Sequence, residues 1–206
     1  MVHRLATRAG SGPDQANLLQ AIMPVCNIGR LAVPDAILNR AGPLDEEERR
    51  IMQAHPRIGA RLLAGSASPL VALAAEVALC QHERWDGSGY PAGLVGQQIP
   101  LGARIVAIAE SFDASLSAPS CGPGRRLGRA VEHMRRDAGA RFDPMLTRVF
   151  LDDLPAMIRL REQPGALQPG EPAGLGRRAR PSAPASNLPA LANRLRLGLR
   201  AALRPA

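Results

Sequence analysis

The sequence predicts an all-α fold, a helical bundle, and three observations support this fold class. The chain of 206 residues is 46% hydrophobic but only 2% aromatic, so Leu, Ala, Ile and Val must build its core. Such a composition suits packed helices better than sheets. Apolar residues recur at helical spacing in most segments before residue 160, and capping residues precede several of these segments.

The first half of the chain is predicted to hold four segments: a helix over 14–30, a short helix or turn over 33–42, and helices over 44–55 and 68–83. Asp14 is expected to cap the first of them, and Asp45 the third, whose early acidic residues suit the helix dipole. Pro56 is expected to break or kink that third helix. Ser68 and Pro69 suit the N-cap and the first helical position of the most apolar segment, which should lie at the centre of the core.

The second half begins with a Gly-rich loop and continues with predicted helices over 100–117, 124–137 and 143–160. Asp143 is expected to cap the last one, with Pro144 at its first position. We therefore expect one domain over 1–160. The tail, 161–206, is rich in Pro, Gly, Ala and Arg.

Within this tail, 162–186 is predicted to be a disordered linker. Residues 187–204 can form a weak basic amphipathic helix that contacts a membrane or a partner, and a frayed Arg-rich tail is the alternative.

The positive charge of the chain gathers in the tail. The net charge is +8, and 161–206 holds eight Arg and two Glu, or +6, which leaves only +2 for the body. The body is therefore not expected to bind nucleic acid specifically. Cys26, Cys80 and Cys121 are spaced for neither a disulfide framework nor a zinc knuckle. Because no stretch suits secretion or a membrane span, we expect a cytoplasmic protein unless a partner holds it at a membrane.

Four polar residues recur at nearly equal intervals on the apolar segments. Asn27, His55, His82 and Glu110 are separated by 28, 27 and 28 residues. Buried polar groups need partners, so this spacing favours an inward-facing cluster. Histidines and carboxylates on facing helices build metal sites in bundles, although a histidine taken alone is more often a helix-end or surface residue than a ligand.

The loop after His82 gives these residues a context. The stretch "QHERWDGSGYPAGLVGQQIP" (81–100) resembles the signature of the HD-GYP family, bacterial phosphodiesterases that hydrolyse cyclic di-GMP in signal transduction. "NIGRLAVPDAILNRAGPL", "IMQAHPRIGARLL", "ARIVAIAESFDA" and "ARFDPMLTRVFL" resemble further motifs of the family. The resemblance covers about 1–160 and implies an HD-domain-like bundle.

The resemblance also implies a site. Members hold two or three iron or manganese ions, bridged by a carboxylate. His55 and His82 match the ligands of the family. At other ligand positions, Cys26 and Asn27 stand for a His-Asp pair, Gln81 for a His and Glu110 for an Asp. The remaining positions implied by the resemblance are Arg30, Arg125 and Arg126 toward substrate phosphate, and Trp85, Asp86, Gly87, Gly89, Tyr90 and Pro91 on a rim that a signalling partner could contact.

Three hypotheses follow. The first is a degenerate HD-GYP module that has impaired hydrolysis or none, and senses cyclic di-GMP or binds a partner. The second is an active phosphodiesterase with an altered metal set. The third is a truncated or decaying product, since the family's upstream histidine, aligned on Arg4, would coincide with Met1. We expect no metal or a single weak divalent ion, for which Cys26, His55, His82 and Glu110 could supply a tetrahedral zinc site.

Overall fold

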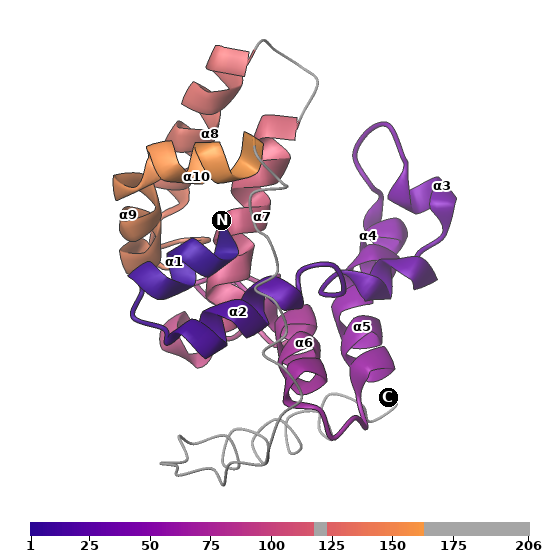
Figure 1. Ribbon diagram of the computed structural model, residues 1–206. Coiled ribbons are helices and arrows are strands. Elements are labelled where there is room, and N and C mark those ends of the chain that lie inside the picture. Colours follow the sequence, from indigo (N-terminus) through magenta and orange to yellow (C-terminus); the bar gives the residue numbers. More distant parts are fainter. Residues whose placement is uncertain (118–122, 163–206) are drawn as a thin grey trace, which may run out of the picture. The chain divides into compact units, whose positions relative to one another are not determined.

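The computed structural model describes residues 1–117 and 123–162 (Figure 1). Within these ranges the chain is helical and forms no strand beyond two isolated bridges, which confirms the all-α prediction. The described residues belong to one compact unit, Met1–Pro164. Cys121, the predicted linker beyond residue 162 and the predicted helix 187–204 lie outside the described residues.

The elements of the described part, in chain order, are α1 (Val2–Arg8), α2 (Pro13–Ala21), the 3-10 turn η1 (Ile28–Ala32), α3 (Asp35–Leu38), α4 (Glu46–Gln53), α5 (His55–Leu63), α6 (Pro69–Cys80), the 3-10 turn η2 (Gly96–Gln98), α7 (Leu101–Ser117), α8 (Pro123–Asp137), α9 (Pro144–Asp152) and α10 (Leu154–Glu162). None of the helices in this part of the chain is both long enough and apolar enough to cross a bilayer.

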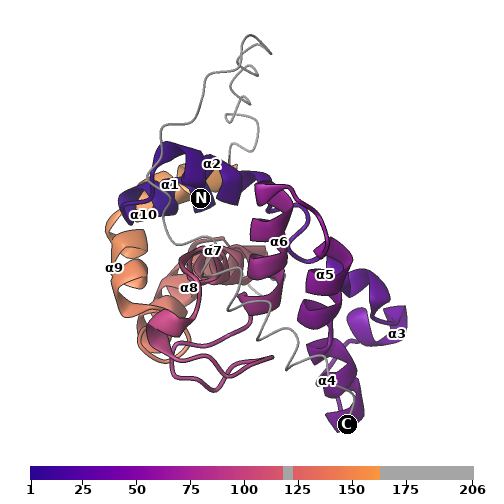
Figure 2. The ribbon, with the colours of Figure 1, turned by 90° about the horizontal axis from the view of Figure 1, so that it is seen from below.

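Helix α7 is the centre of the bundle. It contacts α1, α6, α8 and α9, and Figure 2 shows these helices around it. Its inward residues include Ile105, Ile108 and Phe112, which are fully buried. Phe112 packs edge to face on Phe150 of α9, with ring centroids 5.0 Å apart. The core is built mainly of aliphatic side chains, as the composition predicted, with three phenylalanines in its interior.

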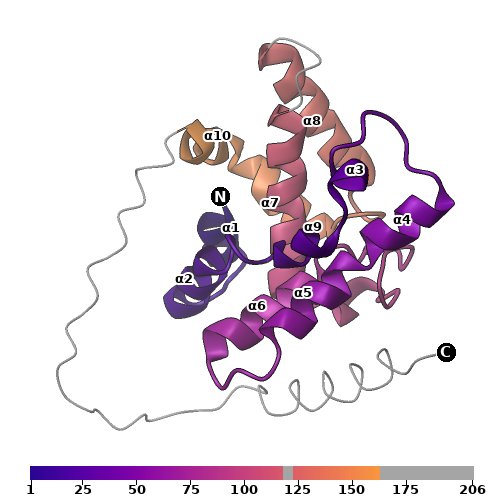
Figure 3. The same ribbon diagram turned by 90° about the vertical axis from the view of Figure 1, so that its right-hand side faces the viewer.

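Helices α5 and α6 lie side by side on one flank of the bundle (Figure 3). The turn η1 packs against α5. The contact between η1 and α5 depends on Gly29. A Cβ on Gly29 would lie 2.0 Å from the backbone oxygen of His55 and 2.6 Å from the nitrogen of Gly59. Only glycine permits this approach. It brings η1 against the start of α5.

Two predicted caps are confirmed. The Asp45 side chain accepts from the Glu48 backbone nitrogen in a capping box, and Asp143 accepts from the nitrogens of Met145 and Leu146. Ser68 is the N-cap of α6 but makes no side-chain capping bond.

The predicted cap at Asp14 is wrong. Pro13 occupies the first position of α2, which moves the N-cap to Gly12 and leaves Asp14 in the first turn.

Several predicted helices are shorter or divided. The segment 14–30 is helical only to Ala21, because Pro24 cannot continue a helix, and 33–42 contributes only α3. The predicted helix 143–160 breaks at Asp153, since Pro155 fits the first turn of a new helix but not a helix interior. Helix α10 then continues to Glu162, two residues past the predicted end.

Helices α1 and α5 were not predicted. Val2, Leu5 and Ala6 of α1 enter the core. Pro56 does end one helix, as expected, but it also starts α5 at once.

Candidate functional site

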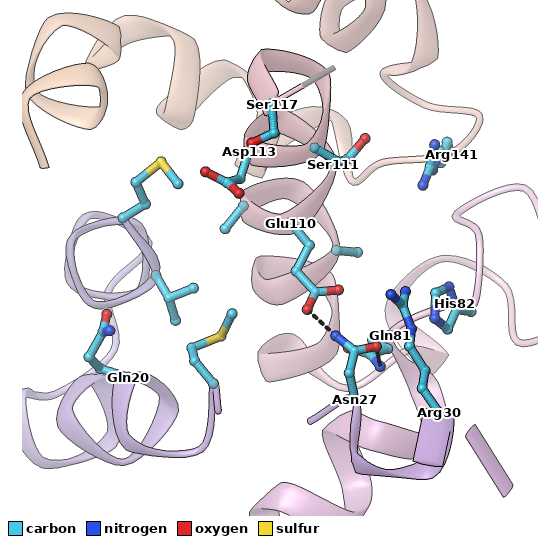
Figure 4. Close-up of a pocket in the computed structure, with 16 residues that line it drawn as sticks. Gln20, Asn27, Arg30, Gln81, His82, Glu110, Ser111, Asp113, Ser117 and Arg141 are labelled. Atoms are coloured by element: carbon cyan, nitrogen blue, oxygen red, sulfur yellow. Dashed lines mark hydrogen bonds between the residues drawn. The ribbon is translucent and has the colours of Figure 1, made fainter. Parts of the chain in front are cut away.

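A pocket of about 500 Å³ opens beside α7, and we call it the α7 pocket. Its walls come from α1, α2, η1, the end of α6, α7 and the stretch before α9. Its polar lining residues, labelled in Figure 4, are Gln20, Asn27, Arg30, Gln81, His82, Glu110, Ser111, Asp113, Ser117 and Arg141.

Four residues form a hydrogen-bonded group at the base of this pocket, which we call the Glu110 cluster: Cys26, Asn27, Gln81 and Glu110. Asn27 Nδ2 donates to Glu110 Oε1 at 2.6 Å (Figure 4). The Cys26 thiol donates to the same oxygen at 3.4 Å. Gln81 Nε2 donates to Asn27 Oδ1 at 3.1 Å and to the Cys26 carbonyl at 3.0 Å. The Asn27 amide therefore links Gln81 to Glu110.

Burial governs the ionisation of this cluster. It raises the pKa of the Glu110 carboxyl, and the bonds from Cys26 and Asn27 oppose that rise. Burial and the nearby Glu110 raise the pKa of the Cys26 thiol to about 12. Cys26 is therefore a protonated thiol at neutral pH, and it is a poor metal ligand in that form. Gln81 Oε1 is buried and has no hydrogen-bond partner among the described residues.

His55 and His82 form a second group, separate from the Glu110 cluster. Their Nε2 atoms lie 3.0 Å apart, and the rings meet edge to face. His55 Nδ1 lies 2.7 Å from the Met52 carbonyl, which can only accept, so Nδ1 carries the proton. In the neutral pair His55 Nε2 then accepts from His82 Nε2. Burial lowers the pKa of both rings, that of His82 to about 3, where His55, Arg30 and Arg141 add repulsion.

Two arginines from distant parts of the sequence, Arg30 and Arg141, line the α7 pocket. Arg30 comes from η1 and is exposed, whereas Arg141, between α8 and α9, is half-buried. No carboxylate of the described residues lies within ion-pair distance of either guanidinium. The pocket's acids are engaged elsewhere, since Glu110 bonds to Asn27 and Asp113 to Arg161 at 2.8 Å.

The loop 81–100 is held by Glu83. This buried side chain accepts from the backbone nitrogens of Ala92 at 2.7 Å and Leu94 at 3.0 Å. Gly89 lets the chain fold back, because a Cβ there would lie 2.3 Å from the nitrogen of Arg84. Tyr90 stacks on His82 with centroids 5.1 Å apart. The loop thereby fixes the position of the His82 ring.

Trp85 and Asp86 of the predicted rim also have partners within the chain. Arg104 lies over the Trp85 ring, 5.7 Å from its centroid, and Asp86 bonds to Arg84 and Ser88. A docking role for the rim, Trp85 to Pro91, stays a prediction.

The structure brings most of the predicted ligand positions together, but as two groups: Cys26 and Glu110 with the two amides, and His55 with His82. Among the described residues no three His, Cys, Asp or Glu side chains lie close enough to hold a metal ion. Of the predicted phosphate contacts, Arg30 lines the pocket. Arg125 and Arg126 stand at the start of α8 and are not among its described lining residues.

Arg141, Ser111 and Asp113 are pocket residues that the sequence reasoning did not single out. Asp113 lies three residues after Glu110 on α7, so the helical period could have indicated it, whereas Ser111 follows Glu110 directly and does not share its helix face. The sequence gives a weaker indication that Arg141 lines the pocket. Arg141 precedes the Phe142-Asp143-Pro144 motif, and its place in the pocket follows from the path of the chain between α8 and α9.

The residues present do not fit a carboxylate-bridged pair of metal ions. Such a pair needs anionic ligands around two cations. Glu110 is the only carboxylate of its cluster, and its Oε1 already accepts from an amide and a thiol. Asn27 and Gln81 are neutral amides, so they add no anionic ligand beside Glu110.

Comparisons with known proteins agree with this fold. The sequence pattern of the HD domain family matches residues 2–146. A solved cyclic GMP-AMP specific phosphodiesterase of Vibrio cholerae superposes with a TM-score of 0.54 at 19% identity, covering 76% of this chain and 42% of that one. At this identity the likeness concerns the fold.

Curated proteins are similar in sequence. A cyclic di-GMP phosphodiesterase response regulator of Xanthomonas campestris is 41% identical over 140 residues, 68% of this chain and 37% of that protein. A cyclic di-GMP phosphodiesterase of Thermotoga maritima is 40% identical over 148 residues, 72% of this chain and 40% of that protein. The chain thus spans about two fifths of their length. Its sequence, fold and motifs agree, and the chain belongs to the HD domain family, in the HD-GYP group that its loop predicted.

Proposed function

We propose that this domain binds a cyclic dinucleotide of the cyclic di-GMP type in the α7 pocket and hydrolyses it slowly or not at all. Its role would then be nucleotide sensing or partner binding. The relatives named as cyclic di-GMP phosphodiesterases support the ligand class. A pocket of about 500 Å³ with two arginines that lack ion-pair partners among the described residues is consistent with a compact dianion.

The hydrogen bond from Asn27 to Glu110 is the observation that supports slow or absent hydrolysis. Two divalent cations a few ångström apart repel strongly in a low-dielectric site, and anionic bridges must offset that repulsion. Asn27 offers a neutral amide, and it presents an N–H donor to the one carboxylate of the cluster. For Glu110 to bind a cation through Oε1, the bonds from Asn27 and Cys26 would have to break.

A second candidate is an active phosphodiesterase with an altered metal set. The adjacent His55 and His82 rings, with Nε2 atoms 3.0 Å apart, favour it, as does the carboxylate of Glu110. Both histidines are neutral, which is the form that binds metals.

One experiment separates the two candidates. The purified chain is assayed for metal by elemental analysis, for cyclic di-GMP binding by calorimetry and for turnover by chromatography of the products. We expect binding, less than one equivalent of metal per chain and no turnover above a blank. Two equivalents of iron or manganese, with conversion to the linear dinucleotide or GMP, would establish the second candidate. Absence of binding would refute the proposal.

A further inference from the structure

The backbone around Arg141 is anchored on two sides. Its nitrogen donates to the Asp137 carbonyl at the end of α8 at 2.8 Å, and its carbonyl accepts from the Trp85 nitrogen of the loop at 3.2 Å. Next to it, the Asp86 nitrogen donates to the Ala140 carbonyl at 2.9 Å. The guanidinium carbon lies 5.1 Å from the centroid of the Phe142 ring. The side chain is therefore carried into the α7 pocket by a fixed stretch of backbone.

The charge of Arg141 is not neutralised within the described residues. Asp137 is the acid that attracts it, but Asp137 is already bonded to Arg136 at 3.0 Å and lies 3.5 Å from His133. Arg84 adds repulsion. A half-buried cation without an anion costs free energy, so the position favours an anionic ligand.

Arg30 faces the same space. Arg30 and Arg141 both line the pocket, and Figure 4 shows both side chains on the side of the pocket where His82 lies. Figure 4 shows the Ser111 side chain turned toward the side of the pocket where Arg141 lies. Two guanidiniums and a hydroxyl are suitable donors for the oxygens of a phosphodiester.

Resting on the proposed function, we propose that Arg141 is a phosphate-binding residue of this chain, which acts with Arg30 on a phosphodiester group of the cyclic dinucleotide. Arg141 thus supplies a cationic contact from the stretch between α8 and α9, whereas Arg125 and Arg126 do not reach the described lining. A guanidinium can bind two phosphate oxygens at once, so both charge and shape contribute to recognition.

The test uses the full chain and titrations with cyclic di-GMP at about 50 and 300 mM NaCl. Arg141→Gln should weaken binding about ten-fold or more at low salt, as expected for the loss of a charged hydrogen bond. It should also make binding less sensitive to salt. Arg141→Lys, which keeps the charge, should recover part of the affinity. Arg148→Gln removes a surface arginine of α9 that is paired with Asp152, and it should bind as the unmodified chain does.

The outcomes separate the inference from the function on which it rests. If the unmodified chain binds and Arg30→Gln weakens binding while Arg141→Gln stays within two-fold, the role of Arg141 is refuted and the function stands. If the unmodified chain does not bind, both are refuted.

A second measurement needs no variant and covers the case in which Arg141→Gln fails to fold. Phenylglyoxal labelling of the unmodified chain, followed by mass spectrometry, should show Arg141 modified more slowly in the presence of cyclic di-GMP. Equal labelling with and without the ligand would overturn the inference.

Discussion

Asn27 Nδ2 and Glu110 Oε1 lie 2.6 Å apart, so a neutral amide donates directly to the half-buried carboxylate of the α7 pocket. Gln81 extends this link through its bond to Asn27 Oδ1. The cluster therefore satisfies its carboxylate with protein donors. This arrangement stabilises the base of the pocket without requiring a cation, and it can be tested by changing one atom.

Asn27→Asp should destabilise the fold in a pH-dependent way. It replaces the N–H donor with a second carboxylate beside Glu110, which raises the pKa of the pair. A raised carboxyl pKa in the folded state lowers stability above the unfolded value, so the loss should be largest near pH 8 and smaller near pH 5. We expect a loss of about 1–3 kcal/mol at pH 8 in denaturant unfolding with chelator present.

The matched control is Asn17→Asp, the same change at an exposed position of α2. It should alter stability little at either pH. Addition of Mn²⁺ should stabilise Asn27→Asp more than the control, because only the former gains a paired carboxylate. Equal stability of the two variants across this pH range would show that the Asn27–Glu110 bond contributes little.

Acid should destabilise the unmodified chain through the histidine pair. The pKa values of His55 and His82 are lowered in the folded state, that of His82 to about 3, so the unfolded chain binds more protons below its usual histidine pKa of about 6.5. Stability should fall as the pH drops from about 7 to 4.5, by at most about 1.4 kcal/mol per pH unit for each histidine.

The unfolding free energy of His82→Gln, measured against pH with chelator present, should have a smaller slope than that of the unmodified chain. The difference should correspond to the uptake of at most one proton on unfolding. Parallel curves for the His82 variant and the unmodified chain would contradict the assignment of a neutral buried His82.

The glycine contact between η1 and α5 gives a test of how the site is positioned. Gly29→Ala would place a Cβ against the His55 carbonyl and the Gly59 nitrogen, so η1 must move away from α5. We expect a loss of about 3 kcal/mol in denaturant unfolding. Gly128→Ala adds the same methyl group at an exposed helical position with no atom within 4 Å, and it should stabilise the chain by about 0.5–1 kcal/mol. The two substitutions should therefore change the free energy of unfolding in opposite directions. If Gly29→Ala leaves that free energy unchanged, the contact is refuted.

The sequence predicted the fold where local signals were strong. The caps at Asp45 and Asp143 act within one turn of the chain, so no tertiary information was needed. Helix α1 was missed because its seven residues offer only a short apolar pattern, and its stability comes from burying Val2 and Leu5 in the core. Helix α5 was missed because a proline that ends one helix also suits the first turn of the next.

The sequence predicted which residues lie at the site, but not which of their side chains bond to one another. The regular spacing of Asn27, His55, His82 and Glu110 indicated an inward cluster. The structure places Asn27, His82 and Glu110 in the lining of one pocket, with His55 against His82. Which side chains bond depends on how closely the backbones approach, as at Gly29, and no pattern within one helix encodes that distance. Arg141 was not predicted for the same reason, since its place in the pocket depends on backbone bonds to the distant Trp85 and Asp137.

Restoring the ligand types of the family should raise the metal content of the chain. The triple change Cys26→His, Asn27→Asp and Gln81→His replaces a protonated thiol and two amides by two imidazoles and a carboxylate around Glu110. The amide N–H that occupies Glu110 Oε1 is lost, and the repulsion between the new carboxylate and Glu110 favours a bound cation. Elemental analysis after growth with iron and manganese should find at least one metal ion per chain in the triple variant, against less than one in the unmodified chain.

Two controls make this result specific. The triple variant with Glu110→Gln should lose the gain, because the second carboxylate is needed to hold the cation, whereas a Glu46→Gln change on exposed α4 should keep it. Turnover of cyclic di-GMP is a separate requirement, because hydrolysis also needs a water positioned in line with the phosphodiester. Two results would contradict this explanation: two metal ions in the unmodified chain, or none in the triple variant. Either would show that the hydrogen-bonded amides of Asn27 and Gln81 do not determine whether this pocket binds cations.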